Sequence, residues 1–159
     1  MSRLITRLRK LTDKKMIVKL TPNVTDITVP ARAAVESGAD ALSLINTLLG
    51  MAVDARTRRP KLARVVGGYS GPAVKPVALR MVWQAVGAVN IPVVGLGGIA
   101  TGRDALEFIM AGAAAVQVGA ANFANPRAME TIADEMAAWM DKNGVKTLDE
   151  IRGCARNAE

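Results

Sequence analysis

The sequence predicts an α/β fold with four parallel strands, because short apolar runs alternate along the chain with segments of helical pattern. The predicted strands are residues 16–20, 41–45, 91–95 and 115–119. The predicted helices are residues 28–37, 75–89, 102–111 and 127–142. Gly38 and Gly112 follow the first and third of these helices, as expected of residues that end a helix. Alternation of this kind is typical of parallel strands joined by right-handed crossovers.

Four strand–helix units are compatible with two architectures. One is an open, doubly wound sheet, and the other is four of the eight units of a (β/α)8 barrel. A complete barrel normally needs about 250 residues, whereas this chain has 159. Four barrel strands alone would leave two unpaired sheet edges, which are a liability for a soluble monomer. The residues alone leave both architectures open.

Composition excludes several classes of active site. Half of the residues are hydrophobic and 22% are charged, which suits a single folded domain or a piece of a larger one. The absence of histidine excludes a Ser-His-Asp or Cys-His nucleophile and histidine-ligated zinc within this chain. A single cysteine, Cys154, can form neither an intramolecular disulfide nor a thiolate metal cage. No apolar run reaches the roughly 18 residues of a membrane span, and no signal peptide is evident. We therefore expect a soluble, cytoplasmic protein.

The formal charge of +7 is concentrated in two clusters, residues 1–15 and residues 56–61. Nucleic-acid binding is one interpretation, but the chain has only five aromatic residues to stack on bases. We favour a solvated helix face in the first cluster, with Leu4, Leu8 and Leu11 on the opposite stripe. A basic protein would also suit an anionic substrate or cofactor.

Polar or glycine-rich residues follow each predicted strand, where ligands bind in parallel α/β folds. The connection over residues 46–74 is long and irregular in pattern, and such connections are usually functional. Gly97 and Gly98 would let backbone N–H groups approach an anion, and the helix beginning near Thr101 would point its positive end there. Gly119 repeats this arrangement one unit later. The pattern favours a phosphate site, although each such turn could also be merely structural.

Three side chains near the strand ends carry candidate chemistry. Lys19 is the only charge within an apolar strand, so it either extends to the rim or lies beside a cofactor that becomes anionic. Asn46 and Thr47 could hydrogen-bond a planar polar ligand or simply cap the start of a loop. Cys154 lies in a polar tail without a histidine partner, which favours an incidental surface thiol over a nucleophile.

Five ordered motifs closely resemble class 1 dihydroorotate dehydrogenase. They are residues 18–23 (VKLTPN), 44–51 (LINTLLGM), 67–80 (GGYSGPAVKPVALR), 95–99 (GLGGI) and 116–119 (VQVG). The second motif most resembles the subclass that passes electrons to NAD through an iron–sulfur flavoprotein. Dihydropyrimidine dehydrogenase shares weaker versions of these motifs, so a flavin domain of that kind is an alternative. The resemblance implies that residues 1–159 form the C-terminal half of an FMN-binding (β/α)8 barrel, in a flavoprotein that oxidises dihydroorotate to orotate in pyrimidine biosynthesis.

The same resemblance assigns roles to residues in the first strand, after the second strand and in the long connection. Lys19 is similar to the lysine beside the flavin ring, which stabilises the reduced anion. Asn46 and Thr47 are similar to the pair that hydrogen-bonds the pyrimidine substrate. Ser70 and Gly71 resemble the glycine-rich loop over the flavin. The implied partners are dihydroorotate or orotate and an electron-transfer subunit that carries iron–sulfur and FAD groups, with no nucleic acid.

The remaining roles concern the phosphate and the base. Gly97, Gly98 and Gly119 resemble the backbone cradle of the FMN phosphate. Ala120 replaces a threonine that is common in the family, so one hydroxyl contact is lost while the backbone donor remains. The family's base is a cysteine or serine in the N-terminal half, and Cys154 does not match it. We therefore expect no catalytic residue and no metal site in this chain, and no activity from it alone.

Two interpretations from other classes remain at this point. A half-barrel with open edges could form homo-oligomers without catalysing a reaction, and we expect self-association in any case. An open-sheet domain could instead bind a different phosphorylated ligand.

Overall fold

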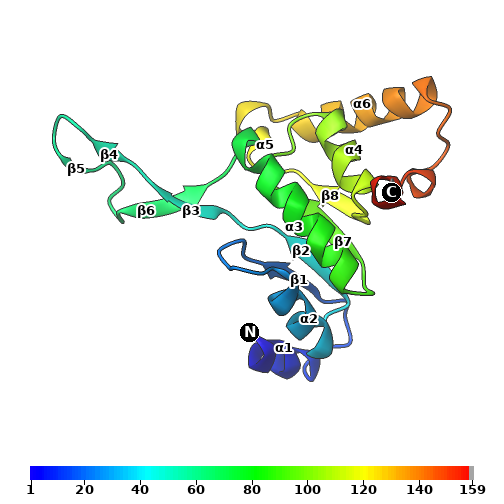
Figure 1. The fold of residues 1–159 in the computed structure, drawn as a ribbon, viewed down its shortest axis with the longest axis horizontal. Coiled ribbons are helices and arrows are strands. Elements are labelled where there is room, and N and C mark those ends of the chain that lie inside the picture. Colours follow the sequence, from blue (N-terminus) through cyan, green and yellow to red (C-terminus); the bar gives the residue numbers. More distant parts are fainter. Residues whose placement is uncertain (158–159) are drawn as a thin grey trace.

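Four parallel strands form the central sheet, in the order β1-β2-β7-β8 (Figure 1). The structure is a computed structural model and describes residues 1–157. The strands are β1 (Ile17–Leu20), β2 (Ala41–Leu44), β7 (Val93–Leu96) and β8 (Ala115–Gln117). Each predicted strand is confirmed, and each pairs in parallel with the next of the four along the chain. This uninterrupted order is that of a barrel segment, because a doubly wound sheet reverses its strand order at a switch point.

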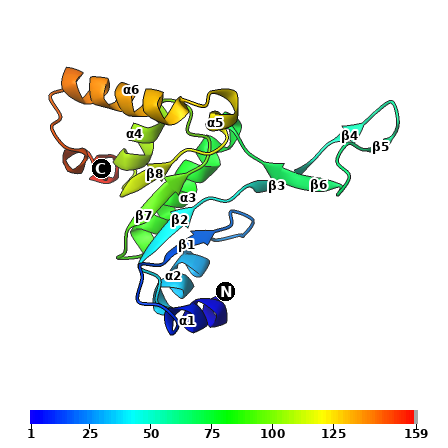
Figure 2. The same cartoon turned by 180° about the vertical axis from the view of Figure 1, so that it is seen from behind.

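Helices α2, α3 and α4 pack against one face of this sheet, and α6 packs on α4 (Figures 1 and 2). All four were expected from the sequence. Their bounds are α2 (Thr28–Glu36), α3 (Lys75–Ala88), α4 (Gly102–Met110) and α6 (Ala128–Lys142). The remaining helical elements are α1 (Ser2–Arg9), α5 (Ala121–Ala124), η1 (Pro72–Val74), η2 (Leu148–Glu150) and η3 (Cys154–Asn157). Within the described residues, no helix is both long enough and apolar enough to cross a bilayer.

The two faces of the sheet differ in burial. On the helical face, Leu42, Leu44 and Val93 are buried in the main hydrophobic core. Gly95 lies on that face beneath α4, where an added Cβ would be 2.6 Å from Cδ1 of Phe108. Glycine at this position therefore lets α4 approach the sheet closely.

The opposite face is largely open. The strand register aligns Lys19, Ser43 and Ala115 at one level of this face. Lys19 and Ala115 are exposed, while Ser43 is buried and donates a hydrogen bond from Oγ to Oε1 of Gln117 at 2.7 Å. In a closed barrel this face would be the interior. The open face and the sequential parallel order together fit half of a (β/α)8 barrel.

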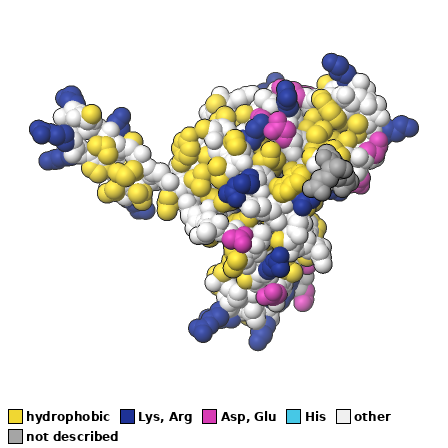
Figure 3. All heavy atoms as spheres, in the orientation of Figure 1, with side chains coloured by type: hydrophobic (Ala, Val, Ile, Leu, Met, Phe, Trp, Pro, Cys, Tyr) yellow, Lys and Arg dark blue, Asp and Glu magenta, His cyan; other side chains and the backbone are white. Residues whose placement is uncertain are grey.

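The connection over residues 46–74 forms a projecting hairpin, called the arm below. The prediction of irregular structure there was therefore wrong. Strand β3 (Leu48–Met51) pairs antiparallel with β6 (Val66–Tyr69), and β4 (Val53–Asp54) pairs with β5 (Arg59–Pro60) nearer the tip. The sequence hid this pairing because two of the four β3–β6 pairs, Leu49↔Gly68 and Gly50↔Gly67, contain glycine, which is depleted in strands. Figure 3 shows hydrophobic side chains along this arm and basic ones at its end.

Helix α1 does not bury the stripe that its sequence suggests. Leu4, Leu8 and Leu11 are 62%, 43% and 81% exposed, whereas Ile5 is buried. The reason is that α1 is fixed from its other side, where Arg9 Nη1 donates to Oδ2 of Asp40 at 2.7 Å. The predicted leucine stripe is therefore solvent-facing in the part of the chain that the structure describes.

Candidate functional site

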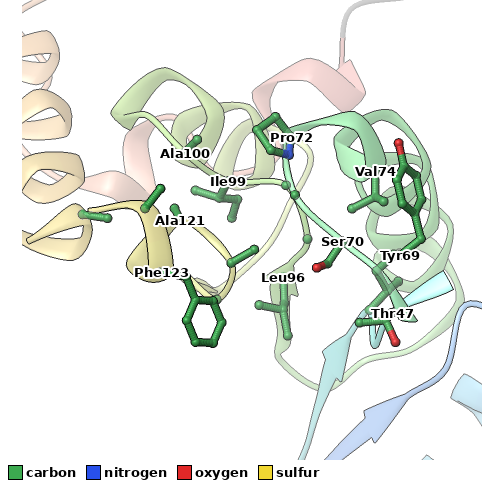
Figure 4. Close-up of a pocket in the computed structure, with 18 of the residues that line it drawn as sticks. Thr47, Tyr69, Ser70, Pro72, Val74, Leu96, Ile99, Ala100, Ala121 and Phe123 are labelled. Atoms are coloured by element: carbon green, nitrogen blue, oxygen red, sulfur yellow. The ribbon is translucent and has the colours of Figure 1, made fainter. Parts of the chain in front are cut away.

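A cavity of about 500 Å³ lies at the carboxyl ends of the strands (Figure 4). Its lining includes every binding residue predicted from the sequence. These are Lys19, Asn46, Thr47, Ser70, Gly71, Gly97, Gly98, Gly119 and Ala120. They come from β1, from both ends of the arm, and from the loops after β7 and β8. The fold thus brings together residues that lie about a hundred positions apart, from Lys19 to Ala120.

Among the described residues, Lys19 is the only charged one in this lining. It is exposed on the open face of the sheet and forms no salt bridge with any carboxylate in residues 1–157. Its registered neighbour Ser43 directs its hydroxyl to Gln117 instead. The ammonium group is therefore available to an anionic ligand, in a cavity to which the described part of the chain contributes no acidic side chain.

The backbone that carries Asn46 and Thr47 is fixed by the loop after β1. The side-chain Nδ2 of Asn23 donates to the carbonyl O of Thr47 at 3.0 Å, and its Oδ1 accepts from the N–H of Leu49 at 2.9 Å. Asn46 N–H donates to the carbonyl O of Leu20 at 3.0 Å. In the described residues neither the Asn46 nor the Thr47 side chain makes a hydrogen bond of its own. A loop-start cap would use these side chains, so their freedom favours a ligand-binding role.

The loops after β7 and β8 supply unpaired backbone donors. Gly97 and Gly98 have φ angles of +133° and +77°, in a region that favours glycine. The N–H groups of Gly98, Gly119 and Ala120 donate no hydrogen bond within residues 1–157. At Gly119 an added Cβ would meet only Cδ1 of Leu96, at 3.9 Å, so this glycine faces nearly open space. Free N–H groups around a cavity suit an anionic oxygen ligand.

The amino terminus of α4 is capped by the chain's own side chains. The side chain of Thr101 caps it, and Asp104 Oδ2 accepts hydrogen bonds from the N–H groups of Ala100 and Thr101. The N–H of Gly102 donates to a carboxylate oxygen of Glu135. The chain's own carboxylates therefore occupy the N–H groups of Ala100, Thr101 and Gly102, and the contribution of the positive end of α4 to an anion site stays a prediction. The free donors lie in the loops themselves.

A partly buried ion cluster lies behind the β7–α4 loop. Lys75 Nζ lies 2.7 Å from Oδ1 of Asp104 and 2.8 Å from Oε2 of Glu107. The hydrogen bonds that Lys75 donates to these carboxylates, that to Asp104 first, raise the pKa of its ammonium group. Burial raises the pKa of the Asp104 carboxyl, but the hydrogen bonds from Lys75 and the loop outweigh it and leave the pKa below its ordinary value. Lys75 and Asp104 are therefore both charged at neutral pH.

Several lining residues were not identified from the sequence. Leu96, Ile99 and Phe123 form apolar wall, and the Phe123 ring lies on the cavity side of α5 (Figure 4). Phe123 is 94% exposed, and α5 has only four residues, too few for a helical pattern to show. Cys154, by contrast, is exposed in η3 and is not part of the cavity, as expected of a surface thiol.

Comparison with known proteins identifies close relatives. A family model described as dihydroorotate dehydrogenase matches residues 1–140. The catalytic subunit of dihydroorotate dehydrogenase B (NAD(+)) from Geotalea uraniireducens is 57% identical over 149 residues, which cover 94% of this chain and 49% of that protein. The subunit of the same name from Geobacter metallireducens is 61% identical over 145 residues, 91% of this chain and 48% of its own. The chain thus spans about half the length of these relatives.

Proposed function

Because the chain belongs to the dihydroorotate dehydrogenase family, we propose that it forms the C-terminal half of an FMN-binding barrel that oxidises dihydroorotate to orotate in pyrimidine biosynthesis. The observation that carries this proposal is the single cavity lined by all nine binding residues predicted from the sequence. The cavity lies at the carboxyl ends of parallel strands, the usual location of active sites in this architecture.

The cavity residues fit a flavin mononucleotide. Apolar side chains such as Leu96 and Ile99 suit a planar ring, and the free N–H groups of Gly98 and Gly119 suit a phosphate. A lone lysine without acidic neighbours in the lining suits a ligand of negative charge. When bound, FMN would supply the acceptor for the hydride, a chemistry that protein side chains lack.

The protein residues would then position the substrate and stabilise charge. Lys19 would lie beside the ring and favour its reduced, anionic form by charge attraction. Asn46 and Thr47 would hydrogen-bond the pyrimidine, since both side chains are free and their backbone is fixed by Asn23. We assign no base to the described residues, because Cys154 lies outside the cavity.

The names of the relatives indicate a catalytic subunit that works with another subunit. We propose an iron–sulfur and FAD subunit as the electron-transfer partner of this protein. We also propose that it acts in the cytoplasm and forms homo-oligomers. The unpaired outer edges of β1 and β8 in the described chain support association.

The visible absorption spectrum of the full-length protein, with and without added FMN, tests the proposal. We expect bound flavin absorbance that bleaches when dihydroorotate is added. Lys19→Ala should weaken FMN retention, and Asn46→Ala should abolish most turnover while FMN stays bound. Matched controls are Lys10→Ala and Asn90→Ala, two exposed residues outside the cavity. A fully flavinated Lys19 variant, or an Asn46 variant with normal turnover, would contradict the role assigned to that residue. A wild-type protein that does not bind FMN would contradict the proposed function.

A further inference from the structure

The loop after β7 lies directly against the first turn of α3. A Cβ added at Gly98 would be 2.6 Å from the backbone N of Lys75 and 2.8 Å from its Cα. Ser70 and Gly71 lie just before this turn and line the same cavity as Gly98. The position of Lys75 therefore sets how the arm's return segment and the β7–α4 loop meet at the cavity.

The side chain of Lys75 crosses from α3 to α4. Its Nζ donates to Oδ1 of Asp104 at 2.7 Å and lies 2.8 Å from Oε2 of Glu107. The side chains of Lys75 and Asp104 are only 24% and 16% exposed, so water screens this ion pair less than a surface pair. Lys75 itself does not line the cavity.

Asp104 holds the loop with its other carboxylate oxygen. Its Oδ2 accepts from the N–H of Ala100 at 3.0 Å, and from the N–H and Oγ1 of Thr101, both at 2.9 Å. These residues follow Gly97 and Gly98 directly. A continuous set of charge-assisted hydrogen bonds therefore runs from Lys75 through Asp104 to the backbone of the loop.

The charges of Lys75, Asp104 and Glu107 also affect how strongly the β7–α4 loop can bind an anion. Asp104 and Glu107 place two negative charges behind the free N–H of Gly98, and Lys75 cancels one of them. Loss of the lysine would leave Asp104 without a cation, and Glu107 with only the exposed Arg103 at 3.9 Å, a pair that salt screens more strongly. A phosphate at Gly98 would then be repelled, although no atom of Lys75 touches it.

We propose that Lys75 is a positioning residue for the flavin phosphate. It fixes Asp104 and thereby the shape of the loop over residues 97–101, and it offsets the carboxylates behind the phosphate donors. This inference rests on the flavin site proposed above.

The test compares FMN with riboflavin, which lacks only the phosphate, as ligands of the full-length protein. Flavin fluorescence titrations give both affinities. Lys75→Met should lower the FMN affinity by about tenfold or more, the scale of a lost hydrogen bond to a charged group, and leave the riboflavin affinity unchanged. Lys75→Arg should largely restore the preference for FMN. Arg103→Met is the matched control, because Arg103 lies on the same helix near Glu107 but is 89% exposed.

The outcomes separate the inference from the function on which it rests. A wild-type protein that binds FMN no more tightly than riboflavin would overturn the proposed phosphate site. A wild-type preference for FMN that persists in Lys75→Met would overturn the role of Lys75, and so would an equal loss of both affinities, which indicates general destabilisation. If Lys75→Met does not fold, Lys75→Ala, which likewise removes both the charge and the hydrogen bond to Asp104, is measured instead and the same ratio decides.

Discussion

Gly68 lies against the side chain of Thr47, across the base of the arm. A Cβ at Gly68 would be 2.8 Å from the Cβ of Thr47, a distance that real side chains do not adopt. Strands β3 and β6 bring the two residues together from opposite ends of the 46–74 connection. The Thr47 hydroxyl is proposed to bind the substrate. Its orientation therefore depends on the absence of a side chain at Gly68, 21 residues further along the chain.

Gly68→Ala should displace Thr47 and weaken orotate binding. Its effect should appear as a higher dissociation constant for orotate, measured from the perturbation of the flavin spectrum, with FMN still bound. Gly67→Ala is the matched control, because a Cβ there meets only Cδ1 at the flexible end of Leu62. Equal orotate affinity in the two variants would show that Thr47 does not contact the substrate.

Asn23→Ala should loosen the segment that carries Asn46 and Thr47. The substitution removes the hydrogen bonds to the Thr47 carbonyl and from the Leu49 N–H, each worth about 0.5–1.5 kcal/mol. Faster amide hydrogen exchange at Leu49, with little change in the strands of the main sheet, is the expected result. Exchange at Leu49 that is as slow as in wild type would contradict this role for Asn23. Asn90→Ala provides the exposed asparagine control.

Asp40 should make stability depend on pH in the acidic range. The N–H of Met16, then Lys15 and Arg9, hydrogen-bond its carboxylate and hold its pKa well below the ordinary value. Since the folded-state pKa lies below the unfolded value of about 3.9, this stabilisation is fully present above that pH and is lost as the pH falls further.

The measurement is the urea midpoint as a function of pH for Asp40→Asn and wild type. The variant should be less stable at pH 7, and the difference should shrink as the pH falls below about 4. Asp134→Asn, an exposed carboxylate on α6 that forms no salt bridge within residues 1–157, should follow the wild-type curve. A difference in urea midpoint between Asp40→Asn and wild type that stays constant at all pH values would contradict this role for Asp40.

The main elements of the fold could be predicted because their signals are local. Apolar runs mark the four strands, and glycines such as Gly38 and Gly112, with φ of +101° and +106°, end helices where they stand. The hairpin arm was missed because glycines interrupt the alternation of β3 and β6. The exposed leucines of α1 were missed because a helical stripe does not reveal whether a neighbouring element covers it.

The same distinction between local and non-local signals applies to the candidate site. Its lining residues follow strand ends or belong to motifs with a family resemblance, so the sequence alone could nominate them. The contacts that position these lining residues could not be predicted from the sequence. Lys75 and Asp104 are 29 residues apart, and Asn23 and Thr47 are 24 apart. No periodicity links residues at such separations, and only the packing of α3 on α4 or of neighbouring strand-end loops brings them into contact.

Gly95→Ala should destabilise the fold from the helical face of the sheet. The new Cβ would lie 2.6 Å from Cδ1 and 3.2 Å from Cγ of Phe108, which is fully buried and cannot rotate away. Overpacking of this kind typically costs about 1–3 kcal/mol. Urea unfolding of the full-length protein measures the loss of stability.

A second substitution, Phe108→Leu, tests the contact itself. Alone it should also destabilise the fold, because it leaves a cavity. In the double variant, the smaller side chain should accommodate the added methyl group. The double variant should therefore lose less than the sum of the single losses, with a coupling of about 0.5–3 kcal/mol. Strictly additive losses would show that α4 shifts as a whole to relieve the contact, and that Gly95 does not set its distance from the sheet.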